Sequence, residues 1–327
     1  MVFLLVSGQN VTLTRYSNIM GAGVMGWPSS EKSNTELISS LEATFSDAKT
    51  DVAEANGASS GPPYANWTST SKDGKTLYIP TLDFTYSALQ EEREQYDITV
   101  KLFFLPNEDK PVRAAHIREA IDLVLKELHV DKIDLLIVAF SGVYFDEESE
   151  DCPDKISSRG PKQADPEPLE SQIETWEMLE ALHKEGMVSR LGLSEFGAER
   201  LEPFLEKVNT PPSVNQVNLR NCCSVPKSLA ELAKSKQIEL LVHNDCTNIL
   251  PRGTTRKLLD GEGADVLGAP QHDLSAGHKR KRNEGAEGAE RLEGEVEPQW
   301  VIKYTAVVKN RGVVENKGYF ACAKYSE

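Results

Sequence analysis

The stretch from Glu185 to Phe196 reads EGMVSRLGLSEF, and residues 215–217 then read NQV. Leu191 to Leu193 forms a short apolar run typical of a strand. A helical pattern separates it from a second strand-like run, Val214 to Leu219. Strand, helix and strand in succession are the unit from which parallel sheets with helices on their outside are built.

The same alternation extends in both directions from this stretch. Apolar periodicity predicts strands at 2–6, 98–104, 133–140 and 238–242, and helices at 33–45, 117–128, 173–182, 201–208, near 229–232 and at 300–308. Alternation of this kind is typical of a TIM-type (β/α)8 barrel and also of a flat doubly wound sheet. Barrels of 327 residues occur as one domain, so we predict a single domain over 1–327.

Three stretches interrupt the alternation and are predicted to be flexible surface insertions. Residues 51–75 are rich in Gly, Ser, Pro and Asn, 146–168 begin with an acidic run, and 261–297 mix Gly with charged residues. The last contains the basic run Lys279 to Arg282. This run resembles a nuclear-import signal, but a solvated charge run in a loop explains it equally simply.

Composition and charge restrict the classes of partner. The chain has 39% apolar and 27% charged residues, as soluble globular proteins do, and a formal net charge of −15. Nucleic acids and anionic membranes attract an excess of Lys and Arg. We therefore expect protein or small-molecule partners, and neither nucleic acid nor membrane.

The amino-terminal segment and the cysteines indicate a cytoplasmic protein. The apolar start Val2 to Val6 is too short for a signal peptide or a membrane span. Five cysteines in a chain of this size do not suggest the disulfide framework of a small secreted domain.

Two motifs suggest a cofactor or a metal, and neither has the required context. Residues 21–26, GAGVMG, match G-x-G-x-x-G, but polar residues precede them and Trp27-Pro28 follows, whereas a dinucleotide motif lies between an apolar strand and a helix. Cys222 and Cys223 are adjacent, and neighbouring side chains on a strand point to opposite faces. With His243 and Cys246 they predict no metal site; buried thiols or a redox-sensitive contact with a partner remain open.

The stretch quoted first resembles the aldo-keto reductases. The corresponding pattern of that family is G-x-x-R-x-I-G-V-S-N-F followed by N-Q, which residues 186–196 and 215–216 match in type and spacing. The resemblance implies an aldo-keto-reductase-like barrel and favours it over the open sheet.

The resemblance also implies which catalytic groups are missing. The family reduces carbonyls with a nicotinamide hydride and a Tyr proton donor tuned by Lys, Asp and His. Lys101 lies where the catalytic Lys is expected, but Ala139 replaces the His, and no D-T-A-x-x-Y-G motif supplies the Asp and Tyr. We therefore predict no catalytic residues, with Lys101 a remnant of the reductase tetrad.

The implied cofactor pocket is altered as well. Ser194 and Gln216 match positions that contact the nicotinamide, but Glu195 replaces an Asn and His243 stands where a stacking aromatic is usual. The segment Lys309 to Lys317 departs from the pattern P-K-S and R-x-x-x-N that grips the adenosine phosphate. We therefore predict no required cofactor, although NADPH binding through Ser194 and Gln216 stays open.

Further segments resemble one branch of that family, the modifier subunits of glutamate-cysteine ligase. They are Asn215 to Leu219 with Cys222-Cys223, Leu240 to Asp245, and Trp300 to Lys324. The branch implies a non-catalytic regulatory subunit that forms a heterodimer with the catalytic subunit, raises its substrate affinity and relieves glutathione feedback. We assign the contact surface, as a hypothesis, to the reactive and polar residues that end apolar strands: Cys222, Cys223, His243, Asn244 and Asp245.

Two alternatives belong to other classes. The first is a working NADPH-dependent reductase that uses Lys101 with Tyr64 or Tyr78 as proton donor. The second is a scaffold that binds the cofactor without turnover.

Overall fold

A computed structural model of the chain describes residues 1–7, 32–55, 63–86, 89–106, 108–145, 166–219, 224–246, 249–250, 252–260, 264, 266–267 and 295–326. The elements, in chain order, are β1 (Val2–Ser7), α1 (Lys32–Ala55), the 3-10 helix η1 (Pro63–Asn66), β2 (Ser69–Thr70), β3 (Thr76–Ile79), the 3-10 helix η2 (Arg93–Gln95), β4 (Tyr96–Phe104), α2 (Lys110–Leu128), β5 (Ile133–Ala139), α3 (Leu169–Lys184), β6 (Val188–Ser194), α4 (Ala198–Leu205), β7 (Val214–Val217), α5 (Lys227–Lys236), β8 (Glu239–Val242), α6 (Arg252–Leu259), β9 (Glu295–Val308) and β10 (Val313–Ser326).

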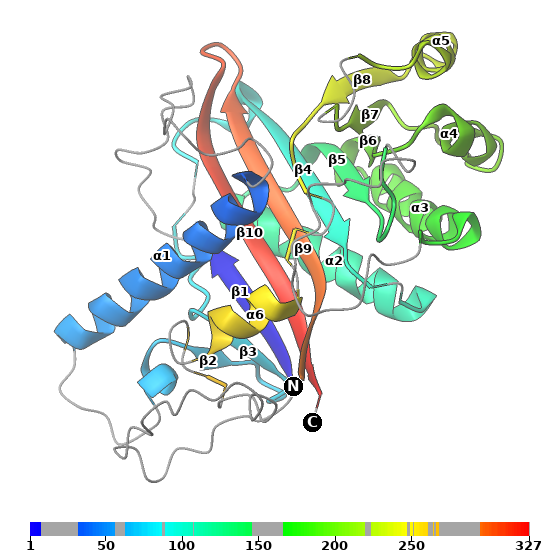
Figure 1. The fold of residues 1–327 in the computed structure, drawn as a ribbon. Coiled ribbons are helices and arrows are strands. Elements are labelled where there is room, and N and C mark those ends of the chain that lie inside the picture. The colour runs from blue at the N-terminus through cyan, green and yellow to red at the C-terminus, as the bar shows by residue number, and fades with distance from the viewer. Residues whose placement is uncertain are drawn as a thin grey trace.

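The strands form one ten-stranded sheet in the order β2-β3-β1-β10-β9-β4-β5-β6-β7-β8 (Figure 1). Strands β4 to β8 are parallel neighbours, and helices connect them along the chain. The long hairpin β9–β10 pairs antiparallel with β4 on one side and with β1 on the other. The two chain ends lie together, because the Tyr325 amide donates to the Met1 carbonyl at 2.8 Å.

Helices cover both faces of this sheet. On one face α2 to α5 enclose the larger core, to which β4 contributes Ile98, Val100, Leu102 and Phe104. On the other face α1 and α6 pack over a second core that includes Phe103, Val301 and Tyr319. Because successive strand residues point to opposite faces, this second face also receives Thr99 and Lys101. A polar region therefore lies beside the second core.

The α/β class of the prediction is confirmed, and so are the predicted strands β1, β4, β5, β6, β7 and β8 and the helices α1 to α5. The strand order differs from that of a closed ring of eight parallel strands: within the described residues β2 and β8 end the order, and the β9–β10 hairpin lies inside it.

The predicted helix at 300–308 is wrong, since this segment is the second half of β9. Trp300, Tyr304 and Val308 recur at helical spacing, but they also alternate with residues of the other face, and all three belong to the larger core. Val, Ile and Thr fill most of the positions between them, and such β-branched residues favour strands.

Much of the three predicted insertions lies outside the described residues, as does the G-x-G-x-x-G match at 21–26. Within 51–75 the structure describes the end of α1, η1 and β2, and within 261–297 it describes the start of β9. The flexibility of the insertions stays a prediction.

Gly318 of β10 is required by a close approach of other groups. A Cβ at this position would collide with the Tyr304 hydroxyl and lie 2.7 Å from the Ser7 carbonyl oxygen, which belongs to backbone and cannot rotate away. Gly318→Ala should therefore lower the free energy of unfolding by about 1–3 kcal/mol, as overpacking does. Urea denaturation followed by circular dichroism measures this loss.

Gly197→Ala is the matched comparison for Gly318→Ala. Its Cβ would lie 4.0 Å from the Phe145 carbonyl oxygen, an ordinary contact, so the variant should lose no more than an N-cap preference, under about 1 kcal/mol. Equal losses in the two variants would contradict the crowding at Gly318.

Candidate functional site

Two lysines face each other across neighbouring strands. Lys101 of β4 is paired in register with Lys303 of β9, and both side chains point to the face that carries α1. Like charges placed directly opposite in an antiparallel pair repel each other. Lys101 is 4% exposed, so water does little to screen this repulsion.

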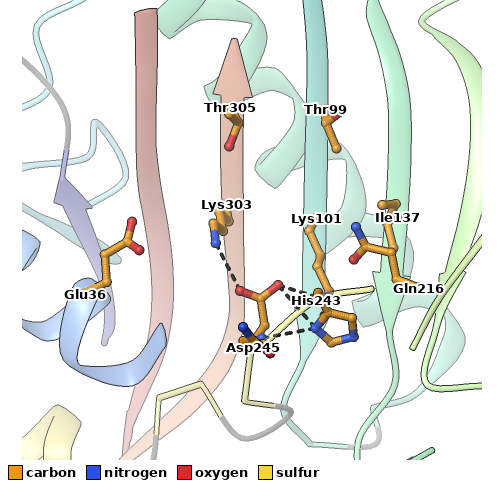
Figure 2. A pocket seen from close by; sticks show the side chains of 10 residues that line it. Glu36, Thr99, Lys101, Ile137, Gln216, His243, Asp245, Lys303 and Thr305 are labelled. Carbon is orange, nitrogen blue, oxygen red and sulfur yellow. Dashed lines mark hydrogen bonds and ion pairs between the residues drawn. The ribbon is translucent and has the colours of Figure 1, made fainter. Parts of the chain in front are cut away.

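Asp245 lies between the two ammonium groups and separates their charges (Figure 2). Its Oδ2 lies 3.1 Å from Lys101 Nζ, and its Oδ1 lies 3.0 Å from Lys303 Nζ. Burial alone would raise the pKa of Asp245, but the two lysines outweigh it and hold that pKa well below its ordinary value. Asp245 is therefore ionised and balances one of the two positive charges.

The two lysines respond differently to their surroundings. Burial lowers the pKa of Lys101, and the charges of Asp245 and Glu195 offset only part of this effect. Burial would also lower the pKa of Lys303, but Asp245 and Glu36 together raise it. Lys303 is thus the more firmly protonated of the pair.

His243 links this ion-pair cluster to the end of β6. Its Nδ1 accepts the Asp245 backbone N–H at 3.1 Å and lies 3.3 Å from Lys101 Nζ. Its Nε2 contacts the Glu195 carboxylate and lies 3.3 Å from Ser194 Oγ. Since Nδ1 accepts from two donors, the ring hydrogen belongs on Nε2, facing Glu195.

Glu195 adopts a backbone conformation that non-glycine residues rarely use, with φ of +69°. Such a conformation costs about 1–2 kcal/mol for an ordinary residue. It is held by the Glu195 N–H, which donates to the Gln216 carbonyl at 2.7 Å, and by the carboxylate, which accepts the Phe145 N–H at 2.9 Å. The strained turn places the carboxylate against His243.

A cavity of about 410 Å³ lies next to this cluster. Figure 2 shows Thr99 and Thr305 on one side of the lysine pair and Asp245 with His243 on the other. Glu36 of α1 closes a further side and pairs with Lys317 of β10 at 2.9 Å. The lining is completed by Ile137, Gln216 and Asn244.

The structure brings together several of the residues predicted from sequence. Lys101, Ser194, His243 and Asp245 form one connected network, Gln216 lines the adjoining cavity, and Asn244 is exposed beside it. Cys222 and Cys223 lie outside the described residues. The contact-surface hypothesis for these residues stays a prediction.

Sequence reasoning missed Lys303, Glu36 and Tyr319. Lys303 lies in the segment mistaken for a helix, and Glu36 and Tyr319 reach the site only through the packing of α1 and β10. The one usable signal was the alternation of Lys303 and Thr305 with buried Ile302, Tyr304 and Ala306, a strand pattern.

No described tyrosine is placed to serve Lys101 as a proton donor. Tyr78 packs against the larger core, on the face of the sheet away from Lys101. Tyr319 lies opposite Lys303 on β10, but burial and the nearby Glu36 raise its pKa well above the ordinary value, so its proton is held tightly. Tyr64 packs against the second core and does not line the cavity.

The described residues do not fit NADPH as the family pattern would hold it. Gln216 Oε1 is buried without a hydrogen-bond partner in the described structure, so it could accept a carboxamide N–H, but the edges of His243 are occupied by the ion-pair cluster. Lys309 donates hydrogen bonds to the carbonyls of Glu94 and Gln95, where β4 begins, whereas Ser194 lies where β6 ends. Since β4 and β6 run parallel, these two groups occupy opposite ends of the sheet.

Comparison of the sequence with known protein families assigns the chain to a family. The sequence model of the aldo/keto reductase family matches residues 81–249, more than half of the chain. This chain belongs to the aldo/keto reductase family. The match contains β4 to β8 and therefore Lys101, Glu195, His243 and Asp245 of the cluster.

Several individual relatives of the chain are named as regulatory subunits. The human glutamate–cysteine ligase regulatory subunit is 26% identical over 234 residues, 72% of this chain and 68% of that protein. A Schizosaccharomyces pombe protein provisionally given the same name is 26% identical over 243 residues, 73% of this chain and 75% of that one. An Arabidopsis thaliana aldo-keto reductase, family 4 member C11, is 30% identical over 152 residues, 46% of this chain and 42% of its own.

Solved structures of the family match a smaller part of the chain. The aldose reductase of Schistosoma japonicum is 21% identical, with a TM-score of 0.32, over 49% of this chain and 50% of that one. Among the helices that the structure describes, none has the length and apolarity to cross a bilayer. Nor do the described His, Cys, Asp and Glu residues form a group of three that could hold a metal ion.

Replacing Asp245 should expose the repulsion between the lysines. Asp245→Asn leaves the buried Lys101 and the half-buried Lys303 with an amide between them, so the free energy of unfolding should fall by about 3 kcal/mol near neutral pH. In the parent protein, the stabilisation due to the depressed pKa is complete above the unfolded value of 3.8 and declines as pH falls below it. The variant should lose that part of the acid dependence, which urea titrations between about pH 5 and 2 measure.

Asp97→Asn is the matched control for Asp245→Asn, because Asp97 is an exposed carboxylate on the same sheet, in β4. It should change stability by less than about 0.5 kcal/mol. If Asp245→Asn lost as little stability as this control, Asp245 would not be needed to offset the repulsion between the two lysines.

Proposed function

We propose that this chain is a non-catalytic regulatory subunit that binds the catalytic subunit of glutamate–cysteine ligase and raises its activity. The observation that carries the proposal is the similarity, over about 72% of this chain, to proteins named as regulatory subunits of that ligase. Relatives that are named as reductases match a smaller part of the chain.

The geometry of the site supports a role without reductase chemistry. Lys101 is bound on one side by Asp245 and on the other by His243, and Ala139 occupies the position of the family's histidine. A carbonyl reduction needs a proton donor beside the lysine, and no described tyrosine takes that place. The cluster therefore serves better to fix the segment 243–245 than to transfer a proton.

The manner of activation follows from thermodynamics. A regulatory subunit raises the activity of its partner only if it binds the more active state more tightly than the less active one. The affinity difference must lie in contacts of the exposed surface, since His243 and Asp245 are themselves mostly buried. Asn244 is exposed between them and is the residue of this segment best placed to touch a partner. The complex is expected in the cytoplasm.

The direct test is reconstitution with the ligase catalytic subunit of the same organism. The two chains should elute together on gel filtration, and the ligase should show a lower KM for glutamate or weaker inhibition by glutathione when this chain is present. Bovine serum albumin at equal concentration controls for protein added without specificity.

Two results would count against the regulatory proposal. Absence of a complex, with ligase kinetics unchanged, would remove it. Turnover of a generic aldehyde with NADPH by this chain alone would instead support the reductase alternative, and Lys101→Met should then abolish that turnover.

Side-chain contributions to the complex can be tested at the predicted contact residues. Asn244→Ala, Cys222→Ser and Cys223→Ser should together weaken binding of the catalytic subunit by about tenfold, the usual effect of a moderate interface contact. Lys236→Ala, at the exposed end of α5, is the control and should leave the Kd unchanged. Equal affinities for all variants, measured by surface plasmon resonance, would remove this surface from the interface.

A further inference from the structure

The cavity beside the lysine pair has the size and lining of a small-molecule site. Its volume of about 410 Å³ lies within the usual range for ligand pockets, about 300–1,000 Å³. Ile137 is its one apolar lining residue, and every other lining side chain carries an oxygen or a nitrogen. A ligand held here would have to be polar and small.

Hydrogen-bond donors converge on one side of the cavity. Lys303 Nζ has three N–H groups, and the described structure gives one of them a partner, Asp245. The hydroxyls of Thr99 and Thr305 lie across the two strands from each other, one step along from the lysine pair. Asp245 takes one of the N–H groups of Lys303, so the others remain for a carboxylate, with which an ammonium group forms charge-assisted hydrogen bonds.

A carboxylate lies on another side of the cavity. Glu36 reaches the cavity from α1, and its carboxylate pairs with Lys317 through Oε1 at 2.9 Å. Burial would raise the pKa of Glu36, but Lys303 and Lys317 outweigh this effect and hold it below the ordinary value. The carboxylate is therefore anionic at neutral pH and has lone pairs for an ammonium group.

An unsatisfied polar atom points to a ligand as well. Gln216 lines the cavity, and its Oε1 is buried without a hydrogen-bond partner in the described structure. Leaving a buried acceptor unpaired costs about 1–3 kcal/mol. A group that donates an N–H from within the cavity would remove that cost, and Figure 2 shows Gln216 on the side of the lysine pair away from Glu36.

We infer that this cavity binds a small aliphatic amino acid as a zwitterion, with its carboxylate on Lys303, Thr99 and Thr305 and its ammonium group on Glu36. The inference concerns the chain by itself and does not depend on the proposed regulatory function. The site lies on the face of the sheet that carries α1. It uses β9 and α1, which are outside the segment matched to the reductase family.

Calorimetric titration of the full chain tests the inference. The probes are glycine, β-alanine and γ-aminobutyrate, which carry the same two charged groups at different separations, L-glutamate, which carries a second carboxylate as well, and acetate and methylammonium, which carry one charged group each. At least one amino acid should bind about tenfold or more tightly than either single-charge probe, because a second charge-assisted contact adds roughly that factor.

Two variants locate the binding site. Glu36→Gln removes the anionic partner of the ammonium group, and Thr305→Val replaces a hydroxyl by a methyl group of similar volume. Each substitution should lower the affinity for the amino acid by about tenfold. Glu42→Gln, an exposed carboxylate on the same helix, should leave the affinity unchanged. Thermal melts of all variants verify that they fold.

Three outcomes would overturn the inference: no binding of any amino acid, binding of acetate as tight as that of the best amino acid, or an affinity that folded Glu36→Gln and Thr305→Val leave intact. The second outcome would identify an anion site at the lysine pair instead. None of these results bears on whether the chain binds the ligase.

Discussion

The pairing of Lys101 with Lys303 across β4 and β9 is the constraint on which the site depends. The register is fixed from the other face of the sheet, where Val100, Leu102, Ile302 and Tyr304 are fully buried. Shifting either strand by one residue would turn these side chains away from the core, so the lysines cannot avoid each other. An anion must therefore be supplied from elsewhere in the chain, and Asp245 supplies it.

Neighbouring residues hold Asp245 in its position between the two lysines. Asp245 follows the end of β8 after His243 and Asn244, and Cys246 and Ile249 beyond it are buried. His243 fixes the segment from the other side through Lys101 and Glu195, and Glu195 keeps a strained backbone to make that contact. Strain is retained where surrounding contacts over-determine a conformation, and such positions are common at functional sites.

The same cluster contains the lysine that the family pattern assigns to catalysis. A lysine that lowers the pKa of a tyrosine must lie beside it, whereas the Lys101 ammonium contacts Asp245 and His243. The altered positions Ala139 and Glu195 fit this reading, because the first removes a proton-carrying ring and the second adds a negative charge that favours a neighbouring cation. These contacts are the ones on which the proposal of a non-catalytic site depends.

How far the sequence predicts this structure depends on how local the determining interactions are. Strands β4 to β8 and helices α1 to α5 follow from apolar periodicity, which is a local signal, and Lys101, Ser194 and Gln216 could be placed from the family pattern. Lys303 could not, because Trp300, Tyr304 and Val308 satisfy helical spacing and strand alternation together, and burial of both faces of β9 decides between them. Glu36 and Lys317 are 281 residues apart, and their meeting is set by how α1 lies on the sheet, which no local pattern records.

The position of the segment 243–245 connects the surface of the molecule with its interior. Asn244 is exposed, while its neighbours His243 and Asp245 hold the buried charges. A protein that contacts Asn244 acts on the backbone that places Asp245, and a molecule in the cavity acts on Lys303, to which Asp245 is bound. If both events favour one arrangement of this segment, each must strengthen the other by the same factor, since coupling between two binding equilibria is reciprocal. The ion-pair cluster is the physical connection through which such coupling would pass, because displacing Asp245 costs the repulsion of two buried lysines.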